Sequence, residues 1–77
     1  MEFDKIRNII AEHLQKPAES ITAEMRFKED LKADSLELFE IISHLDEEYG
    51  IELSNEDAEE IKTVGDAVEM FKKYVNA

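Results

Sequence analysis

The chain contains no cysteine, a single proline and only two glycines among its 77 residues. Without cysteine there is no disulfide framework, no thiolate metal site and no cysteine nucleophile, so any thiol chemistry must come from another molecule. No apolar run approaches the roughly 18 residues that a membrane span requires. The first residues also lack the basic-then-apolar pattern of a secretion signal. We therefore expect a cytoplasmic protein without a membrane span.

Positive charge is scarce as well, with nine Lys and Arg against twenty Asp and Glu and a net charge of −11. The excess lies in residues 33–61, which hold eleven acidic residues and no lysine or arginine. The negative charge of this segment repels phosphate backbones and anionic membrane surfaces, which argues against nucleic acid and lipid headgroups as partners. We expect partners that present basic patches.

The length of the chain indicates one domain, residues 1–77, that is too small to bury much more than about 60% of its unfolded surface. A domain of this size has little room for a large preformed catalytic cleft, which disfavours an enzyme. High net charge is also a mark of disordered chains. The regular spacing of the apolar residues indicates a folded chain instead.

Apolar residues recur every three to four positions in three segments, which predicts three amphipathic helices. They are Phe3, Ile6, Ile10 and Leu14 in the first segment, Leu38, Ile41, Ile42, Leu45 and Tyr49 in the second, and Val64, Ala67, Val68, Phe71 and Val75 in the third. The first helix ends before Pro17. The second begins at Ser35 and closes at Gly50, because glycine readily takes the left-handed conformation of a helix end.

Two further pairs of polar residues mark helix starts. Ser54 with Asp57 predicts a short fourth helix, and Thr63 with Asp66 caps the last long one. The short alternation Ile51-Glu52-Leu53 has no second strand to pair with, so its apolar residues are expected in the core. The predicted fold class is all-α, a small four-helix bundle with three longer helices and one short one.

A long loop joins the first and second helices, from Lys16 to Asp34. Its 19 residues are many for a compact domain unless the loop is functional or held by its own side chains. Apolar residues at four positions are expected to hold it against the bundle: Ile21, Met25, Phe27 and Leu31.

The tripeptide Asp34-Ser35-Leu36 lies at the head of the second helix. Asp34 is a suitable N-cap and Glu37 stands three residues on, so Ser35 is predicted to be the first helical residue. Unpaired amides and the positive end of the helix dipole favour an anion there, such as a phosphate ester. For the tripeptide alone, a polar residue beside a cap is the better interpretation. The surrounding motif has to decide.

That surrounding motif resembles the acyl carrier protein family, in its bacterial fatty-acid-synthesis type. The resemblance is carried by residues 27–37 (FKEDLKADSLE), 46–53 (DEEYGIEL) and 59–64 (EEIKTV), and it spans nearly the whole chain. The sequence departs from the family pattern at Lys32, where glycine is usual, and at Ser54, where many members have proline.

The resemblance implies a carrier rather than an enzyme. A phosphopantetheinyl transferase would move 4′-phosphopantetheine from coenzyme A onto Ser35, within the motif formed with Asp34 and Leu36. The thiol of this arm would carry acyl groups as thioesters between enzymes of fatty acid biosynthesis, and the acyl chain would fold back between the helices of the monomer. Two alternatives stay open: a carrier of polyketide, aminoacyl or D-alanyl groups, and an acidic helical adaptor without a prosthetic group.

A helical wheel starting at Ser35 suggests where partner enzymes dock. The residues on or beside the serine's side are Leu36, Phe39, Glu40, Ser43 and Glu47, and Glu37 joins them in the predicted docking surface. We expect Leu36 and Phe39 to be semi-exposed apolar spots rimmed by acids that attract basic patches on the transferase and on acyl-processing enzymes. An ordinary solvated face is the alternative for each acid.

Other polar groups carry no prediction of a site. The acids Asp46, Glu48, Glu52, Glu56 and Asp57 lack the spacing of a calcium loop, and no metal site is predicted. His13 and His44 are interpreted as isolated surface residues without catalytic partners.

Overall fold

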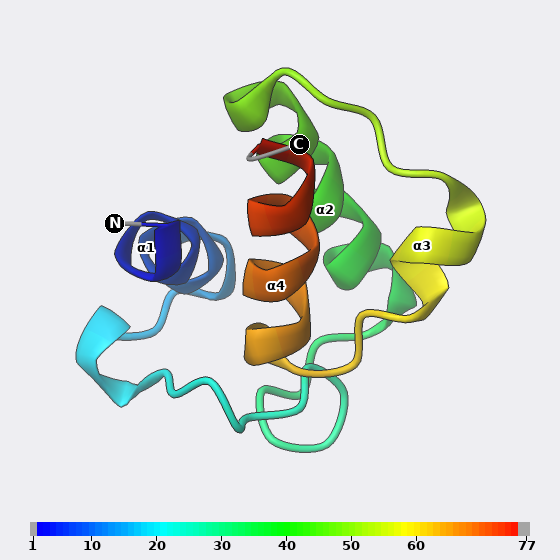
Figure 1. The fold of residues 1–77 in the computed structure, drawn as a ribbon. Coiled ribbons are helices and arrows are strands. Elements are labelled where there is room, and N and C mark those ends of the chain that lie inside the picture. Colours follow the sequence, from blue (N-terminus) through cyan, green and yellow to red (C-terminus); the bar gives the residue numbers. More distant parts are fainter. Residues whose placement is uncertain (1, 76–77) are drawn as a thin grey trace.

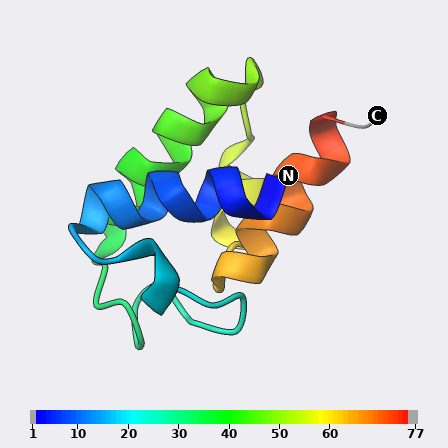
Figure 2. The same cartoon turned by 90° about the vertical axis from the view of Figure 1, so that its left-hand side faces the viewer.

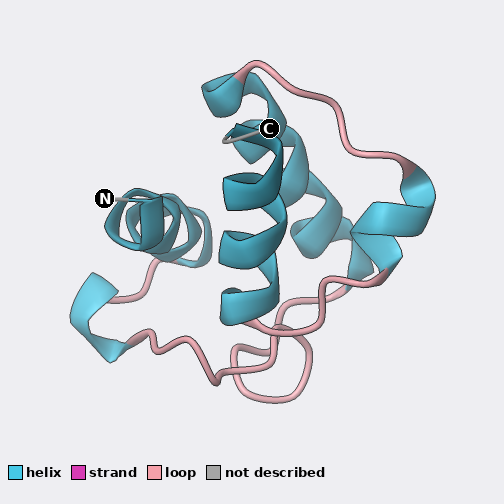
Figure 3. Ribbon diagram, viewed as in Figure 1, coloured by secondary structure: helices cyan, strands magenta, loops and turns pink. Residues whose placement is uncertain are grey.

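The computed structural model describes residues 2–75. Its elements are α1 (Glu2–Leu14), the 3-10 helix η1 (Ala18–Ser20), α2 (Ser35–Tyr49), α3 (Asn55–Glu59) and α4 (Val64–Val75). Helix α1 packs against both α2 and α4, and the short α3 lies on the side of α2 that faces away from α1 (Figures 1 and 2). The described chain contains helices and loops and no strand (Figure 3), which confirms the predicted all-α four-helix fold.

The helix ends follow local chemistry. Pro17 follows α1 closely, and Gln15 turns the chain away from the helix with φ 55°. Helix α2 ends at Gly50 with φ 67°, where the Gly50 amide donates to the carbonyls of Asp46 and Glu47. Both ends agree with the sequence prediction. Proline disrupts a helix, and a glycine in the left-handed conformation ends one.

The predicted caps are present at the starts of α3 and α4. The amide of Asp66 donates to Thr63 Oγ1 at 3.0 Å, and the amide of Thr63 donates back to Asp66 Oδ2 at 3.1 Å. At α3 the amide of Asp57 donates to Ser54 Oγ at 3.1 Å. The carboxylate of Asp57 does not complete a capping box, because it accepts the hydroxyl of Tyr74 from α4 instead.

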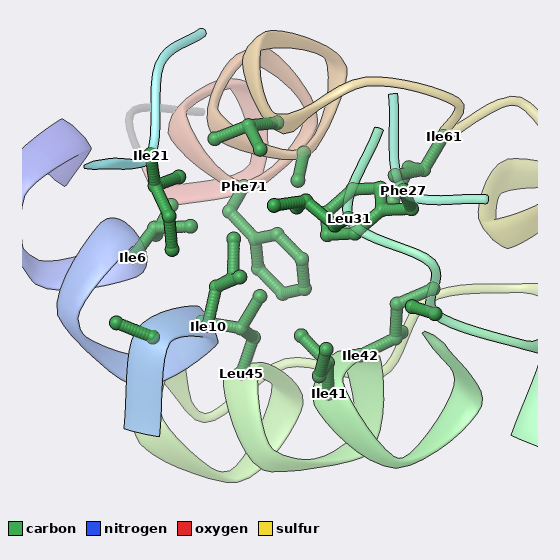
Figure 4. Close-up of a cluster of buried hydrophobic side chains, with 14 of the residues drawn as sticks. Ile6, Ile10, Ile21, Phe27, Leu31, Ile41, Ile42, Leu45, Ile61 and Phe71 are labelled. Atoms are coloured by element: carbon green, nitrogen blue, oxygen red, sulfur yellow. The ribbon is translucent and has the colours of Figure 1, made fainter. Parts of the chain in front are cut away.

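The core gathers side chains from α1, the long loop, α2 and α4 around Phe71, whose ring lies at the centre of Figure 4. The completely or almost completely buried large residues are Phe27, Phe71, Ile6, Ile10, Ile41, Leu45 and Val64. Leu53 is also buried and Ile51 packs at the edge of the core, as expected from the sequence. Burial of these side chains supplies the main driving force for folding.

The long loop is held as predicted. Ile21, Phe27 and Leu31 are buried, and Met25 is partly buried against the core. Its middle also pairs with the α3–α4 connection, because Arg26 and Thr63 form an isolated antiparallel bridge. This loop is therefore part of the folded structure.

A local turn adds to the order of the same loop. The amide of Arg26 donates to Asp30 Oδ2 at 2.8 Å, and the Arg26 guanidinium lies near the same carboxylate. The backbone hydrogen bond from Arg26, followed by the nearby positive charges, holds the pKa of Asp30 below its usual value. The turn therefore keeps a negative charge next to Arg26.

The prediction that the two histidines are isolated was wrong. His13 Nε2 and His44 Nδ1 lie 2.8 Å apart, and the rings meet edge to face at 5.0 Å. The two residues are 31 positions apart in the sequence. The packing of the last turn of α1 against the middle of α2 brings them together, which neither helix alone indicates.

The acidic segment 33–61 should make stability depend on salt. Among the described residues its ion pairing is limited to Glu48, which meets Lys5 at 3.2 Å. The other carboxylates repel one another, and added salt screens that repulsion. We expect the melting temperature of the protein to rise steadily with NaCl between about 0.01 and 0.5 M. A melting temperature that stays constant over this range would contradict the expectation.

Candidate functional site

The head of α2 is fixed by a complete capping box. The amide of Glu37 donates to Asp34 Oδ1 at 2.8 Å, and the amide of Asp34 donates to Glu37 Oε1 at 3.3 Å. Asp34 is extended, with φ −79° and ψ 179°, so the helix begins at Ser35 as predicted. Ser35 is exposed to solvent. Its backbone is thus held in place while its hydroxyl stays accessible.

The first amides of α2 can accommodate an anion. The amide of Glu37 is bonded to the Asp34 side chain, and the amide of Leu38 to the Asp34 carbonyl at 2.9 Å. Within residues 2–75 the amides of Ser35 and Leu36 have no acceptor. Free amides at the positive end of a helix dipole favour phosphate groups. The surroundings of Ser35 therefore fit a phosphate ester on its hydroxyl.

The residues that lead into Ser35 are also fixed. Ala33 is buried and its amide donates to the Phe27 carbonyl at 2.8 Å. Lys32 adopts a left-handed conformation with φ 59°, which the glycine of the family pattern would take without a steric cost. A side chain in this conformation costs roughly 1 kcal/mol relative to glycine.

A groove of about 660 Å³ opens beside Ser35, between α2, α3 and the long loop. Its apolar lining consists of Phe27, Leu38, Phe39, Ile42, Ala58 and Ile61. Its polar lining consists of Arg26, Lys28, Glu29, Ser35, Asn55, Glu59 and Lys62. The family resemblance implies an acyl chain that folds back between the helices, and this groove lies between two helices and the long loop. The contributions of the loop and α3 were not predicted residue by residue.

The floor and the mouth of the groove differ in exposure. Phe27, Ile42 and Ile61 are nearly inaccessible and belong to the core, whereas Phe39 is 59% exposed at the mouth. One wall of the groove is formed by α3, a helix of only five residues, through Asn55, Ala58 and Glu59. An apolar chain that enters from the side of Ser35 would therefore contact core side chains directly.

A side-chain hydrogen bond ties helix α3 to α4. The hydroxyl of Tyr74 donates to Asp57 Oδ2. This hydrogen bond, together with the charge of Asp57, raises the pKa of Tyr74. The contact keeps the outer wall of the groove close to the bundle.

The predicted docking residues lie on the outer face of α2. Leu36 is 66% exposed, and Phe39, Glu40, Ser43 and Glu47 are exposed as well. We refer to these five residues as the α2 strip. Glu37 differs from them, since it is half-buried and its carboxylate accepts the Asp34 amide. The expected exposure of the two apolar spots is confirmed.

One acidic residue of α2, Asp46, is partly buried against the rest of the protein. Asp46 is half-buried, and its Oδ1 atom has no hydrogen-bond partner in the described chain. Burial raises the pKa of Asp46, and the negative charge of Glu52 adds to this, while a hydrogen bond from the Leu53 backbone opposes it. Residues 2–75 contain no group of three or more His, Asp or Glu side chains placed to hold a metal ion.

Comparisons with known proteins agree with this geometry. Residues 4–71 match the family model described as a phosphopantetheine attachment site. A Mycobacterium tuberculosis protein classed as an acyl carrier protein superposes with a TM-score of 0.90 at 35% identity, covering 96% of this chain and 99% of the other. The acyl carrier protein of Enterococcus faecalis superposes with a TM-score of 0.78 at 39% sequence identity, and the match covers 94% of this chain and 91% of the other.

None of the described helices is long and apolar enough to cross a membrane. The residues matched by the family model include the capped start of α2 and every residue that lines the groove. The prosthetic group of this family is 4′-phosphopantetheine, and its members carry acyl chains without being enzymes. The chain belongs to the acyl carrier protein family.

Proposed function

We propose that this chain carries fatty acyl intermediates as thioesters on a 4′-phosphopantetheine arm attached to Ser35. It acts as a single monomeric domain, residues 1–77, in the cytoplasm, and passes its cargo between enzymes of fatty acid biosynthesis. The observation that carries the proposal is the position of Ser35, which is exposed at a capped helix start and opens directly onto an apolar groove.

The residues around Ser35 have separate roles in this proposal. Asp34 orders the first turn of α2 through its hydrogen bond to the Glu37 amide. The free amides of Ser35 and Leu36 stabilise the negative phosphate that esterifies the hydroxyl. When bound, the arm supplies the reactive thiol that a chain without cysteine lacks.

The groove supports a fatty acyl cargo. Its volume of about 660 Å³ lies within the range of about 300–1,000 Å³ that is typical of small-molecule sites. Its floor consists of Phe27, Ile42 and Ile61, which offer no hydrogen-bonding side chain. Each buried methylene of an acyl chain contributes about 0.8 kcal/mol there. An aminoacyl or D-alanyl group would place its ammonium group against this apolar surface at a cost.

Loading of the protein tests the attachment. The apo protein is incubated with coenzyme A, Mg²⁺ and a phosphopantetheinyl transferase that is active on a control carrier, and its intact mass is measured. We expect a gain equal to one phosphopantetheinyl group. An unchanged mass of folded protein would overturn the proposal and favour an adaptor without a prosthetic group.

The cargo requires a second measurement. Holo protein is exposed to an extract of the source cell, and the group released from its thioester is identified by mass spectrometry. We expect saturated acyl chains of several lengths. Release of only an aminoacyl, D-alanyl or polyketide group would assign the protein to a specialised pathway.

We also propose that the α2 strip docks the transferase and the acyl-processing enzymes. Its acids lie beside the exposed Leu36 and Phe39, so charge speeds the encounter with a basic patch and the apolar side chains add short-range contact. Because the charges of the strip are exposed to solvent, binding should be weak, fast and sensitive to salt.

Reversing the charge of the strip should slow loading. For the double variant Glu40→Lys/Glu47→Lys we expect the initial rate of Ser35 modification to fall about tenfold at low salt, since steering raises association rates by about 10-fold or more. The matched control is Glu19→Lys/Glu69→Lys, which changes the net charge equally at exposed positions outside α2. Equal rates for the two double variants would remove the docking role of Glu40 and Glu47.

A further inference from the structure

The groove beside Ser35 holds an unusual share of the few positive charges in the chain. Of nine lysines and arginines, three line it: Arg26, Lys28 and Lys62. None of them comes from residues 33–61, where basic residues are absent. The three basic side chains therefore lie outside the acidic segment and border the groove that opens next to Ser35.

The three basic residues differ in their partners. The guanidinium of Arg26 lies 3.2 Å from Glu29 Oε2 and 3.6 Å from Asp30 Oδ2, so its charge is neutralised locally. Within the described part of the chain, Lys28 and Lys62 form no ion pair. Both are exposed. Their ammonium groups are consequently available to a negatively charged ligand, and we refer to Lys28 and Lys62 as the basic rim.

Backbone hydrogen bonds of one residue place the basic rim close to Ser35. The Phe27 amide donates to the Lys62 carbonyl at 3.0 Å, and the Phe27 carbonyl accepts the Ala33 amide at 2.8 Å. Lys28 follows Phe27 directly, and Ala33 precedes Ser35 by two residues. The backbone at Phe27 is thereby fixed between that of Lys62 and that of Ala33, so that Lys28 lies on the middle one of three adjacent segments and Lys62 on an outer one.

We propose that Lys28 and Lys62 bind the phosphodiester of the arm on Ser35 and so hold the beginning of the arm over the groove. This inference rests on the proposed function, because it requires the arm to be attached there. A phosphodiester adds a negative charge beside Asp34 and at the head of a helix rich in acids. Lysine binds phosphate as a mobile point charge, and two unpaired lysines offset the local repulsion.

The stability difference between the holo and apo forms measures this interaction without any partner enzyme. Wild type, Lys28→Gln/Lys62→Gln and the control Lys72→Gln/Lys73→Gln are each prepared in both forms at low salt. The control removes the same charge from exposed positions on α4 that do not line the groove. Complete loading is verified for each protein by intact mass.

We expect modification to raise the melting temperature of the wild type and of the Lys72/Lys73 control by about 3 °C, which is the order of shift that a charge-assisted contact gives in a domain of this size. For Lys28→Gln/Lys62→Gln the gain should be at most about 1 °C. The side-chain ¹⁵Nζ signals of Lys28 and Lys62, but not of Lys72, should shift on modification.

Each contrary outcome has a distinct meaning. A wild type that gains no mass contradicts the proposed function, and the basic rim loses its ligand with it. Full loading with the same gain in melting temperature for all three proteins overturns the role of the basic rim alone. Slower loading of Lys28→Gln/Lys62→Gln with an unchanged holo-minus-apo difference also overturns it, and assigns the two lysines to carboxylates of the transferase.

Discussion

Replacing Ser35 with alanine is expected to abolish attachment of the arm and to leave the fold intact. The Ser35 hydroxyl is exposed and makes no hydrogen bond within residues 2–75, and alanine is a good helix former. Loss of this oxygen should therefore remove the nucleophile while changing the free energy of unfolding by no more than about 0.5 kcal/mol. Intact mass after incubation with the transferase and a thermal melt by circular dichroism measure the two effects.

Ser20→Ala is the matched control for this variant. Ser20 is exposed in η1, outside both the α2 strip and the groove. The Ser20→Ala protein should gain one full phosphopantetheinyl group, because Ser35 is retained. A Ser35→Ala protein that still gains mass would place the attachment elsewhere in the chain.

Phe27→Ala is expected to have the largest effect on stability among the residues of the groove. Phe27 is 1% exposed, forms part of the groove floor and packs with Leu31 and Ile61 in the core (Figure 4). Truncation of a buried phenylalanine costs about 3–5 kcal/mol. A 77-residue domain has a total stability of only about 4–12 kcal/mol.

Urea unfolding should show this loss as a lower midpoint, and the melting temperature should fall by at least about 12 °C. The matched control is Phe39→Ala, which makes the same chemical change at a side chain that is 59% exposed. We expect it to cost less than about 1 kcal/mol, because little apolar area is removed from the interior. Similar losses of stability for the two variants would contradict the burial of Phe27 in the hydrophobic core.

The features that the sequence predicted well depend on neighbouring residues. Helix α2 and its capping box follow from an apolar spacing of three to four and from two acids three residues apart, Asp34 and Glu37. The exposure of Leu36 and Phe39 follows from the same periodicity. Ser35 is part of this local pattern, so its position at a helix start could be derived before the fold was known.

The features that the sequence did not predict depend on contacts between distant segments. Lys28 and Lys62 approach the same groove because the Phe27 and Lys62 backbones are hydrogen-bonded, and no periodicity reports such a contact. His13 and His44 meet for the same kind of reason, through packing of two helices. Lys32 is an intermediate case, since the departure from glycine was visible but its left-handed backbone was not.

The most direct test of this account is to locate the arm within the loaded protein. Wild-type protein is modified by the transferase and digested, and the modified peptide is fragmented in a mass spectrometer. We expect the phosphopantetheinyl group on Ser35 alone, within a peptide that contains Asp34 and Leu36. A group found on Ser20, Ser43 or Ser54, or on no serine, would contradict the central claim that the capped start of α2 is the attachment site.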